Sequence, residues 1–144
     1  MSRHTTDELL QILHSIENAE ELDEAVTLNV DADKGLTFSE YITEQTEQAA
    51  LPAGDLIRRA HIQRNYGYQI LNGSRRPGRD KVIAMCLALS LPLEEVQRAL
   101  TIAEENTFYP RRRRDAILIF GIHRHLSVEE VNQLLFEIQE SVLQ

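Results

Sequence analysis

The sequence predicts an all-α protein, and three observations lead to this prediction. Apolar residues recur at the three- and four-residue spacing of amphipathic helices through most of the 144-residue chain. Three Ser/Thr-x-x-Glu spacings, beginning at Thr5, Thr37 and Ser127, match the capping box that opens a helix. Strand-like alternation is confined to residues 25–30, and we expect no internal repeat.

The composition indicates a folded protein of a reducing compartment. Hydrophobic residues make up 42% and charged residues 26% of the chain, which are ordinary globular values. A single cysteine, Cys86, excludes an internal disulfide framework and a multi-cysteine zinc site. The first residues lack the apolar core of a signal peptide, and no apolar run approaches the roughly 20 residues of a membrane span. We therefore expect a cytoplasmic protein with no membrane contact.

Residues 1–36 are expected to form an acidic helical extension at the N-terminus. A helix begins near residue 6, and an acidic tail over residues 17–24 follows it. Residues 31–35 have the composition of a turn, which places a domain boundary there.

Residues 37–105 are expected to form a central domain of short helices joined by tight turns. Pro52 can occupy the first turn of a helix, where its missing N–H would be unpaired in any case. The Asn72-Gly73 pair ends another helix, because glycine tolerates the left-handed conformation. The expected helices begin near residue 38 and near Pro52, and then run over residues 63–72, 79–89 and 93–103.

Residues 106–144 are expected to form a C-terminal helix pair. Apolar residues 117–120 predict a buried helix, and Ser127 opens the last helix. The run from Arg111 to Arg114 opposes the helix dipole, so it is a candidate contact for phosphate or for an acidic protein partner. The apolar side of the last helix is either core or the seam of a homodimer, and it consists of Val128, Val131, Leu134, Leu135, Ile138 and Val142.

The net charge of −8 is unevenly distributed along the chain. Residues 1–54 carry −10, residues 55–81 carry +5, residues 82–110 carry −3, and residues 111–144 are neutral. A basic island in an acidic protein can bind a polyanion locally, because a potential acts over about 8–10 Å. The acidic segment either shields this island or is simply a solvated face.

The basic island coincides with a recognisable order of elements. A helix containing LIRRAHI (56–62) precedes a polar helix and a basic, proline-containing turn, QRNYGYQILNGSRRP (63–77), and two apolar helices follow. This order, over residues 37–103, resembles the five-helix domain of phage-repressor-like (Cro, XRE) helix-turn-helix regulators. The resemblance implies an all-α, five-helix repressor-like domain with helical extensions at both ends, in which residues 64–72 are the recognition helix.

The resemblance also implies how the chain would contact DNA. An α-helix fits the major groove, where arginine can bind guanine and asparagine or glutamine can bind adenine. These base-reading residues would be Arg64, Asn65 and Gln69. The residues expected to hold DNA phosphates, without reading sequence, are Arg58, Tyr66, Tyr68, Ser74, Arg75, Arg76 and Arg79.

Two residues depart from the family's pattern. Ala53 stands where members usually carry a phosphate-contacting glutamine, and Gly67 stands where the recognition helix usually buries an aliphatic side chain. Glycine inside a helix costs about 1 kcal/mol relative to alanine. Either a ring from Tyr66 or Tyr68 fills the space at Gly67, or the helix is repacked, and the sequence leaves both alternatives open.

No catalytic, metal or cofactor site is expected, so the chain is predicted not to be an enzyme. The histidines lack metal-ligand spacing, and the sequence has no phosphate-binding glycine loop or nucleophile elbow. Cys86 lies on an apolar helix and is expected to be a small buried hydrophobe. Residues 29–40 partly match a calcium loop, but the glycine stands one position late and Lys34 takes the sharp turn.

The sequence therefore predicts a sequence-specific transcriptional regulator that binds double-stranded DNA as a homodimer. The alternative is a non-enzymatic protein–protein interaction adaptor on a degenerate helix-turn-helix fold, which Ala53, Gly67 and the net acidity favour. Pairing of the basic residues of 58–79 with carboxylates of 1–54 would favour the adaptor. Convergence of those residues on the exposed face of the recognition helix would favour DNA binding.

Overall fold

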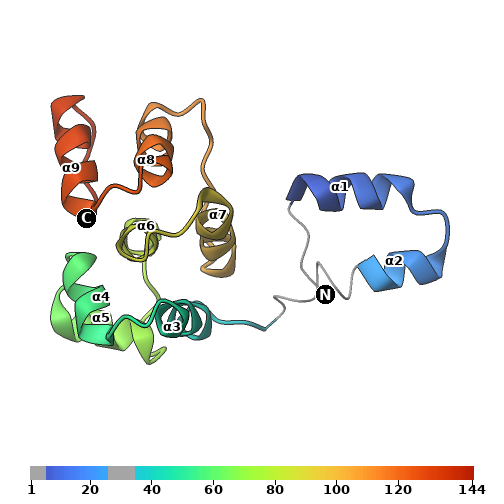
Figure 1. The fold of residues 1–144 in the computed structure, drawn as a ribbon, viewed down its shortest axis with the longest axis horizontal. Helices are drawn as coiled ribbons and strands as arrows, with labels where there is room; N and C mark the ends of the chain where they lie inside the picture. The colour runs from blue at the N-terminus through green and yellow to red at the C-terminus, as the bar shows by residue number, and fades with distance from the viewer. Residues whose placement is uncertain (1–5, 26–34) are drawn as a thin grey trace. The chain divides into compact units, whose positions relative to one another are not determined.

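The computed structural model describes residues 6–25 and 35–144, and the regular elements in these ranges are all α-helices (Figure 1). The all-α prediction is confirmed for these residues. The chain divides into two compact units, Met1–Leu36 and Thr37–Gln144. Among the described helices, none is long and apolar enough to cross a membrane.

The described part of the first unit is a pair of helices, α1 (Thr6–Ser15) and α2 (Ala19–Ala25), which contact each other. The sequence predicts α1 but places only an acidic tail where α2 lies. A side-chain cap starts α2, because Asn18 Oδ1 accepts a hydrogen bond of 2.8 Å from the Glu21 N–H. None of the described side chains of this unit is buried.

Several N-terminal expectations fall on residues outside the described ranges. They concern the cap at Thr5, the strand-like alternation after Ala25 and the first half of the calcium-like loop. In the described half of that loop, the Glu40 carboxylate accepts hydrogen bonds from the N–H and hydroxyl of Thr37. This carboxylate therefore serves a helix cap.

Five helices form the first part of the second unit. The helix α6 lies at their centre, where α4 and α7 contact it, while α3 contacts α5 and α7 (Figure 1). Every residue of α6 from Val82 to Leu87 is buried, so this helix is apolar around its whole circumference. The five helices are α3 (Phe38–Gln48), α4 (Ala53–Arg59), α5 (Arg64–Leu71), α6 (Arg79–Ala88) and α7 (Leu93–Ile102).

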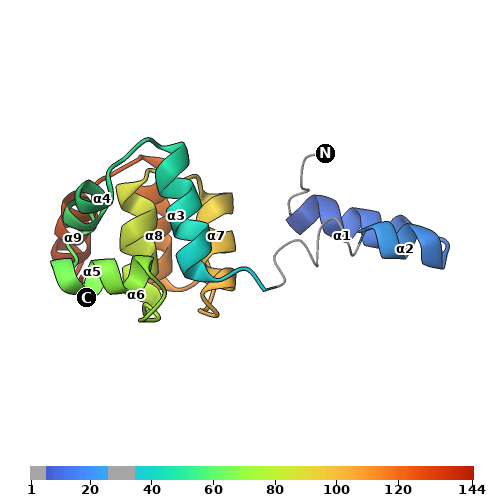
Figure 2. The same ribbon diagram turned by 90° about the horizontal axis from the view of Figure 1, so that it is seen from below.

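Two further helices, α8 (Arg113–His123) and α9 (Val128–Glu137), complete the second unit as a hairpin (Figure 2). Here α8 packs on α7 and α9 packs on α6. The capping box predicted at Ser127 is present, with reciprocal bonds of 3.0 and 3.1 Å to Glu130. Val142 was predicted on α9 but lies beyond the end of this helix.

Five connections within the second unit use one kind of turn, which also follows the end of α9. Each turn contains a non-glycine residue in the left-handed conformation, with φ of 53° at Ala50, 57° at His61, 53° at Ser90, 59° at Glu104, 53° at His125 and 65° at Gln139. The N–H of this residue donates to the carbonyl three residues earlier, and the next N–H donates to the carbonyl five residues earlier. These bonds pair the last carbonyls of the preceding helix.

The hairpins α6–α7 and α8–α9 follow the same pattern at a shift of 35 residues, from Leu91 to Leu126. Residues 91–96 read LPLEEV, and residues 126–131 read LSVEEV. The turn bond from the Leu91 N–H to the Cys86 carbonyl corresponds at this shift to that from the Leu126 N–H to the Gly121 carbonyl. The expectation of no internal repeat is corrected: at this shift α7 and α9 have the same bounds, and the residues quoted above match.

Candidate functional site

The helix α5 presents two of the three predicted base-reading residues to solvent. The Gln63 side chain caps this helix by accepting a bond of 2.8 Å from the Tyr66 N–H. Arg64 and Asn65 follow in the first turn, and both are exposed. Gln69, one turn after Asn65, is half-buried. The exposed end of α5 is therefore its N-terminal end.

Gly67 allows α5 to approach α4 closely. A Cβ atom at this position would lie 2.6 Å from Ile57 Cγ2 and 2.7 Å from Ile57 Cγ1, which is closer than atoms can pack. Ile57 is only 2% exposed, so its side chain cannot turn away into solvent. Ile57 on α4 thus occupies the space, so of the two alternatives the structure shows the repacked helix and not a ring from Tyr66 or Tyr68.

The ring of Tyr68 lies on the outside of α5, where it is 39% exposed. The Arg64 guanidinium stands over this ring, 5.8 Å from its centroid. The Tyr68 hydroxyl reaches the first turn of α4, because it lies 3.3 Å from the position that a Cβ of Gly54 would take. One aromatic side chain therefore orients Arg64 and links α5 to the start of α4.

The ring of Tyr66 orients Arg75 as the ring of Tyr68 orients Arg64. The Arg75 guanidinium lies 5.4 Å from the centroid of the Tyr66 ring, and its Nε donates a long bond of 3.5 Å to Gln69 Oε1. The nearby Ser74 hydroxyl donates to Asn72 Oδ1 at 2.6 Å, so it belongs to the turn after α5. Arg75 is thus held beside the exposed face of α5.

Two of the predicted phosphate-binding arginines form exposed ion pairs. Arg58 pairs with Asp55 at 2.9 Å, and Arg76 pairs with Glu104. Exposed pairs of this kind contribute about 0–1 kcal/mol and exchange readily for another anion. Arg59, next to Arg58 in the last turn of α4, is exposed and makes no ion pair to a described residue. Arg59 is not among the residues predicted to hold phosphates, although it lies in the basic island of residues 55–81.

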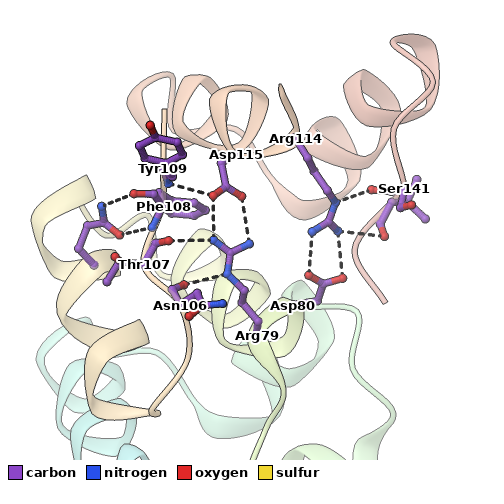
Figure 3. A network of polar contacts seen from close by, with 11 residues as sticks. Arg79, Asp80, Asn106, Thr107, Phe108, Tyr109, Arg114, Asp115 and Ser141 are labelled. Carbon is purple, nitrogen blue, oxygen red and sulfur yellow. Dashed lines mark hydrogen bonds and ion pairs between the residues drawn. The ribbon is translucent and has the colours of Figure 1, made fainter. Parts of the chain in front are cut away.

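Arg79 is held inside the second unit, which corrects its prediction as a phosphate-binding residue (Figure 3). Its guanidinium donates to both oxygens of Asp115, at 3.0 and 3.1 Å. It also donates to the carbonyls of Asn106 and Thr107 and covers the ring of Phe108. This network uses the donors that a phosphate would need.

The Asp115 carboxylate is only 3% exposed, and it also accepts a bond of 2.9 Å from the Tyr109 N–H. Burial opposes its ionisation, but the hydrogen bonds from Arg79 and Tyr109 and the positive charge of Arg79 outweigh burial. The pKa of Asp115 is therefore lower than the ordinary aspartate value. Asp115 stays ionised and keeps Arg79 in place.

Arg114 repeats this arrangement in the opposite direction. It donates to both oxygens of Asp80, at 3.1 and 3.0 Å, and to the carbonyls of Ser141 and Val142 (Figure 3). Arg79-Asp80 and Arg114-Asp115 are equivalent in the 35-residue repeat, so each Arg binds the Asp of the other copy. Two hairpins in one chain therefore contact each other in the reciprocal way of an isologous interface.

Contacts within the chain involve only part of the run from Arg111 to Arg114. Arg113 donates to the Ile138 carbonyl at 2.7 Å, so Arg113 and Arg114 tie the C-terminal tail to the helices. Arg111 and Arg112 remain exposed. Arg113 is exposed as well, so the contact with an acidic partner stays a prediction for Arg111, Arg112 and Arg113.

The apolar side of α9 lies largely in the core, which is one of its two predicted alternatives. Val128, Val131 and Leu135 are buried and Leu134 and Val142 are half-buried, whereas Ile138 is exposed. Burial raises the pKa of the Cys86 thiol, which stays protonated in the core. Within residues 6–25 and 35–144, no three His, Cys, Asp or Glu side chains come together as metal ligands would.

The surface around α5 thus contains Arg64, Asn65 and Arg75 together with Tyr66 and Tyr68. The adjoining helix α4 adds Arg58 and Arg59. Arg79 does not belong to this surface, because Asp115 binds it. Comparisons of the chain with protein-family models, with curated proteins and with solved structures found no match. Support for a function therefore comes from the placement and chemistry of the chain's own residues.

Proposed function

We propose that this chain is a sequence-specific DNA-binding transcriptional regulator of the helix-turn-helix type, with α5 as its recognition helix. The observation that carries the proposal is the first turn of α5. Arg64 and Asn65 are exposed there, and neither makes an ion pair or a hydrogen bond to a described carboxylate. Their side chains are therefore available to a ligand.

The chemistry of these side chains suits the major groove of DNA. An arginine can donate two hydrogen bonds to guanine, and an asparagine can pair with the edge of adenine. The ring of Tyr68 restricts Arg64, so less conformational entropy is lost when the guanidinium binds a base. The amide oxygen of Gln69 accepts a hydrogen bond from Arg75. The amide nitrogen of Gln69 is a donor that can bind a base edge.

The closeness of α4 and α5 supports the same proposal. Gly67 lets α5 lie against Ile57, so α4 and α5 form one rigid support for the exposed first turn. Exposed arginines on both sides of that turn are suited to phosphates, which position a protein without reading sequence. The residues proposed for this role are Arg58, Arg59, Arg75, Arg76 and Tyr68.

The partners of the basic residues bear on the adaptor alternative. Arg58, Arg76 and Arg79 pair with carboxylates that all follow residue 54. Within the second unit, therefore, no arginine of 58–79 pairs with a carboxylate of residues 37–54. The adaptor function remains a candidate on one observation: Ala53 gives the start of α4 no side chain that can bind a phosphate.

The proposal includes double-stranded DNA as the partner, a homodimer as the binding species and the cytoplasm as its location. Two copies would place two recognition helices on successive major grooves, about 34–36 Å apart on a palindromic site.

The experiment is a selection from a random-sequence duplex pool, followed by titration of the retained DNA at several salt concentrations. We expect one palindromic sequence to be enriched, with log affinity falling by about 0.9 per phosphate contact for each unit of log salt. The variant Arg64→Ala with Asn65→Ala should lose this enrichment and keep the salt dependence, because base readout is removed and phosphate contacts remain.

The matched control is Arg111→Ala, which removes one exposed positive charge outside α4 and α5 and should keep the enriched sequence. Absence of binding at low salt, from a protein with a helical circular dichroism spectrum, would reject the proposal in favour of the adaptor.

A further inference from the structure

The outer faces of α8 and α9 each carry one exposed phenylalanine. On α8, Phe120 is 46% exposed and lies among Ala116, His123 and Arg124, with the Arg124 guanidinium 5.1 Å from the centre of its ring. These residues follow one another at three- and four-residue spacing and share a face. This outer face of α8 contains no carboxylate.

The exposed residues on the outer face of α9 follow one another at the same spacing. This face is acidic, whereas the outer face of α8 is basic. Phe136 is 73% exposed, and the exposed residues around it are Glu129, Gln133 and Glu137. The whole of α9 contains no Lys or Arg. One helix of the hairpin therefore presents a phenylalanine in a basic setting, and the other presents a phenylalanine in an acidic setting.

We propose that a second copy of this chain covers these faces, with the outer face of α8 in one copy against the outer face of α9 in the other. Charge complementarity favours this pairing over α8 on α8 or α9 on α9, since like charges opposed at an interface are costly. The N-terminal unit is a poorer occupant of α9, because its described residues carry seven carboxylates and no Lys or Arg.

The internal repeat supports the need for a cover. In the first hairpin, Met85 stands at the position of Phe120 and is fully buried. Likewise α7 has α3 packed against it: the Tyr41 hydroxyl donates to Glu95 at 2.7 Å, and Arg98 lies over the Tyr41 ring. The equivalent positions of α9, Glu130 and Gln133, are exposed. Thr101, at the position of Phe136, is exposed in the first hairpin as well, so the repeat supports a cover over Phe120 and Gln133, and exposure and charge alone support one over Phe136.

The first hairpin is thus covered by α3 and α4, whereas residues 37–144 provide no equivalent helices for the second. A second copy supplies the two missing surfaces by reciprocal contact, in which α8 meets α9 twice about a two-fold axis. This arrangement concerns the homodimer of the proposed function and involves no residue of α4 or α5. It can therefore be tested without DNA.

The test is sedimentation equilibrium of the full chain, without DNA, up to roughly 100 μM, which covers weak specific association. We expect a monomer–dimer equilibrium in the unaltered chain. Phe120→Asp and Phe136→Asp should each raise the dimer dissociation constant about tenfold or more, as loss of a central aromatic contact does.

Mixing the two variants gives the sharper result. Each variant alone has both reciprocal contacts altered, whereas a mixed dimer keeps one contact between an unaltered α8 and an unaltered α9. The mixture should therefore associate more tightly than either variant alone. The matched control is Leu10→Asp, which changes an apolar residue that is 61% exposed in the N-terminal unit and should leave the dissociation constant unchanged.

Because Phe120 and Phe136 are exposed, the variants should keep the thermal unfolding midpoint of the unaltered monomer. A monomer throughout the concentration range would overturn the proposal, and so would variants that dimerise as tightly as the unaltered chain. An unaltered chain that stays monomeric while amides of α8 and α9 become exposed on deletion of residues 1–36 would assign the cover to the N-terminal unit instead.

Discussion

Asp115 holds together three segments that are distant in the sequence. It binds Arg79 at the start of α6, accepts the N–H of Tyr109 in the connector and itself lies in the first turn of α8. Because the Arg79–Asp115 pair is largely shielded from water, removal of one partner leaves a charge without compensation. Loss of the Arg79–Asp115 pair should therefore lower the free energy of unfolding of the whole second unit.

Asp115→Asn should lower the free energy of unfolding by about 3 kcal/mol at neutral pH. The folded state lowers the pKa of Asp115, so this stabilisation is complete above the ordinary aspartate pKa of about 3.9. It is lost as the pH falls through the lowered pKa of the folded state. Urea unfolding between pH 6 and pH 2 should therefore show the difference between the two proteins shrink below about pH 3.9.

The control for this prediction is Asp55→Asn, which removes the exposed partner of Arg58 and should cost less than about 1 kcal/mol. Equal effects of the two substitutions would contradict the structural importance of Asp115.

At the residue scale, the sequence predicts which side chains could bind a ligand better than it predicts which residues of the same chain contact them. Arg64 and Asn65 were selected for their side chains, and both are exposed. Arg79 was selected for the same reason, but it binds Asp115, which lies 36 residues later in the sequence. Gly67 was recognised as unusual, yet its explanation required knowing that Ile57 lies against it. Long-range neighbours of this kind leave no local signal in one sequence.

At the scale of elements, the repeated turns with a left-handed non-glycine residue lower the stability of the chain, and substitution can remove this cost. A residue with a side chain in the left-handed conformation is less stable than glycine by roughly 1 kcal/mol. Ala50 and Ser90 are both exposed, so their side chains contribute little packing. The turns are therefore places where the chain is less stable than its fold allows.

Ala50→Gly and Ser90→Gly should each raise the free energy of unfolding by about 0.5–1 kcal/mol. Urea unfolding should show a higher midpoint with an unchanged slope. The matched control is Ala49→Gly, next to Ala50 but with φ of −78°, where glycine gains nothing and should destabilise. Stabilisation by all three substitutions would rule out the conformational explanation.

Elements with local signals were predicted closely. The Thr37 and Ser127 capping boxes mark α3 and α9, because both partners of a capping box lie within four residues. By contrast, α2 was missed because its acidic composition resembles a solvated tail and its cap is a single Asn18 bond. The five-helix repressor-like arrangement remains a prediction, as does the DNA contact surface of α5.

At the scale of the whole molecule, the two units differ in how much they bury. The second unit contains all the buried core residues among the described part of the chain, whereas the first has none. Because stability follows buried apolar contacts, the units should open with different free energies.

Native-state hydrogen exchange should therefore protect the amides of α6, α8 and α9 to a similar, high degree, because the reciprocal Arg–Asp pairs join the two hairpins. Amides of α1 and α2 should exchange much faster. Mass-spectrometric exchange with peptide resolution measures both. Rapid exchange of α8 and α9 relative to α6 would mean that the second hairpin opens independently.

The short turns also bear on the speed of folding. The pairs α4–α5, α6–α7 and α8–α9 each consist of consecutive helices in contact. The chain therefore forms much of its core by closing loops of only a few residues, which loses little entropy before contacts form. A topology of this kind has a low contact order, and such proteins reach their native state within microseconds to milliseconds. A newly made copy would thus expose its apolar helices only briefly.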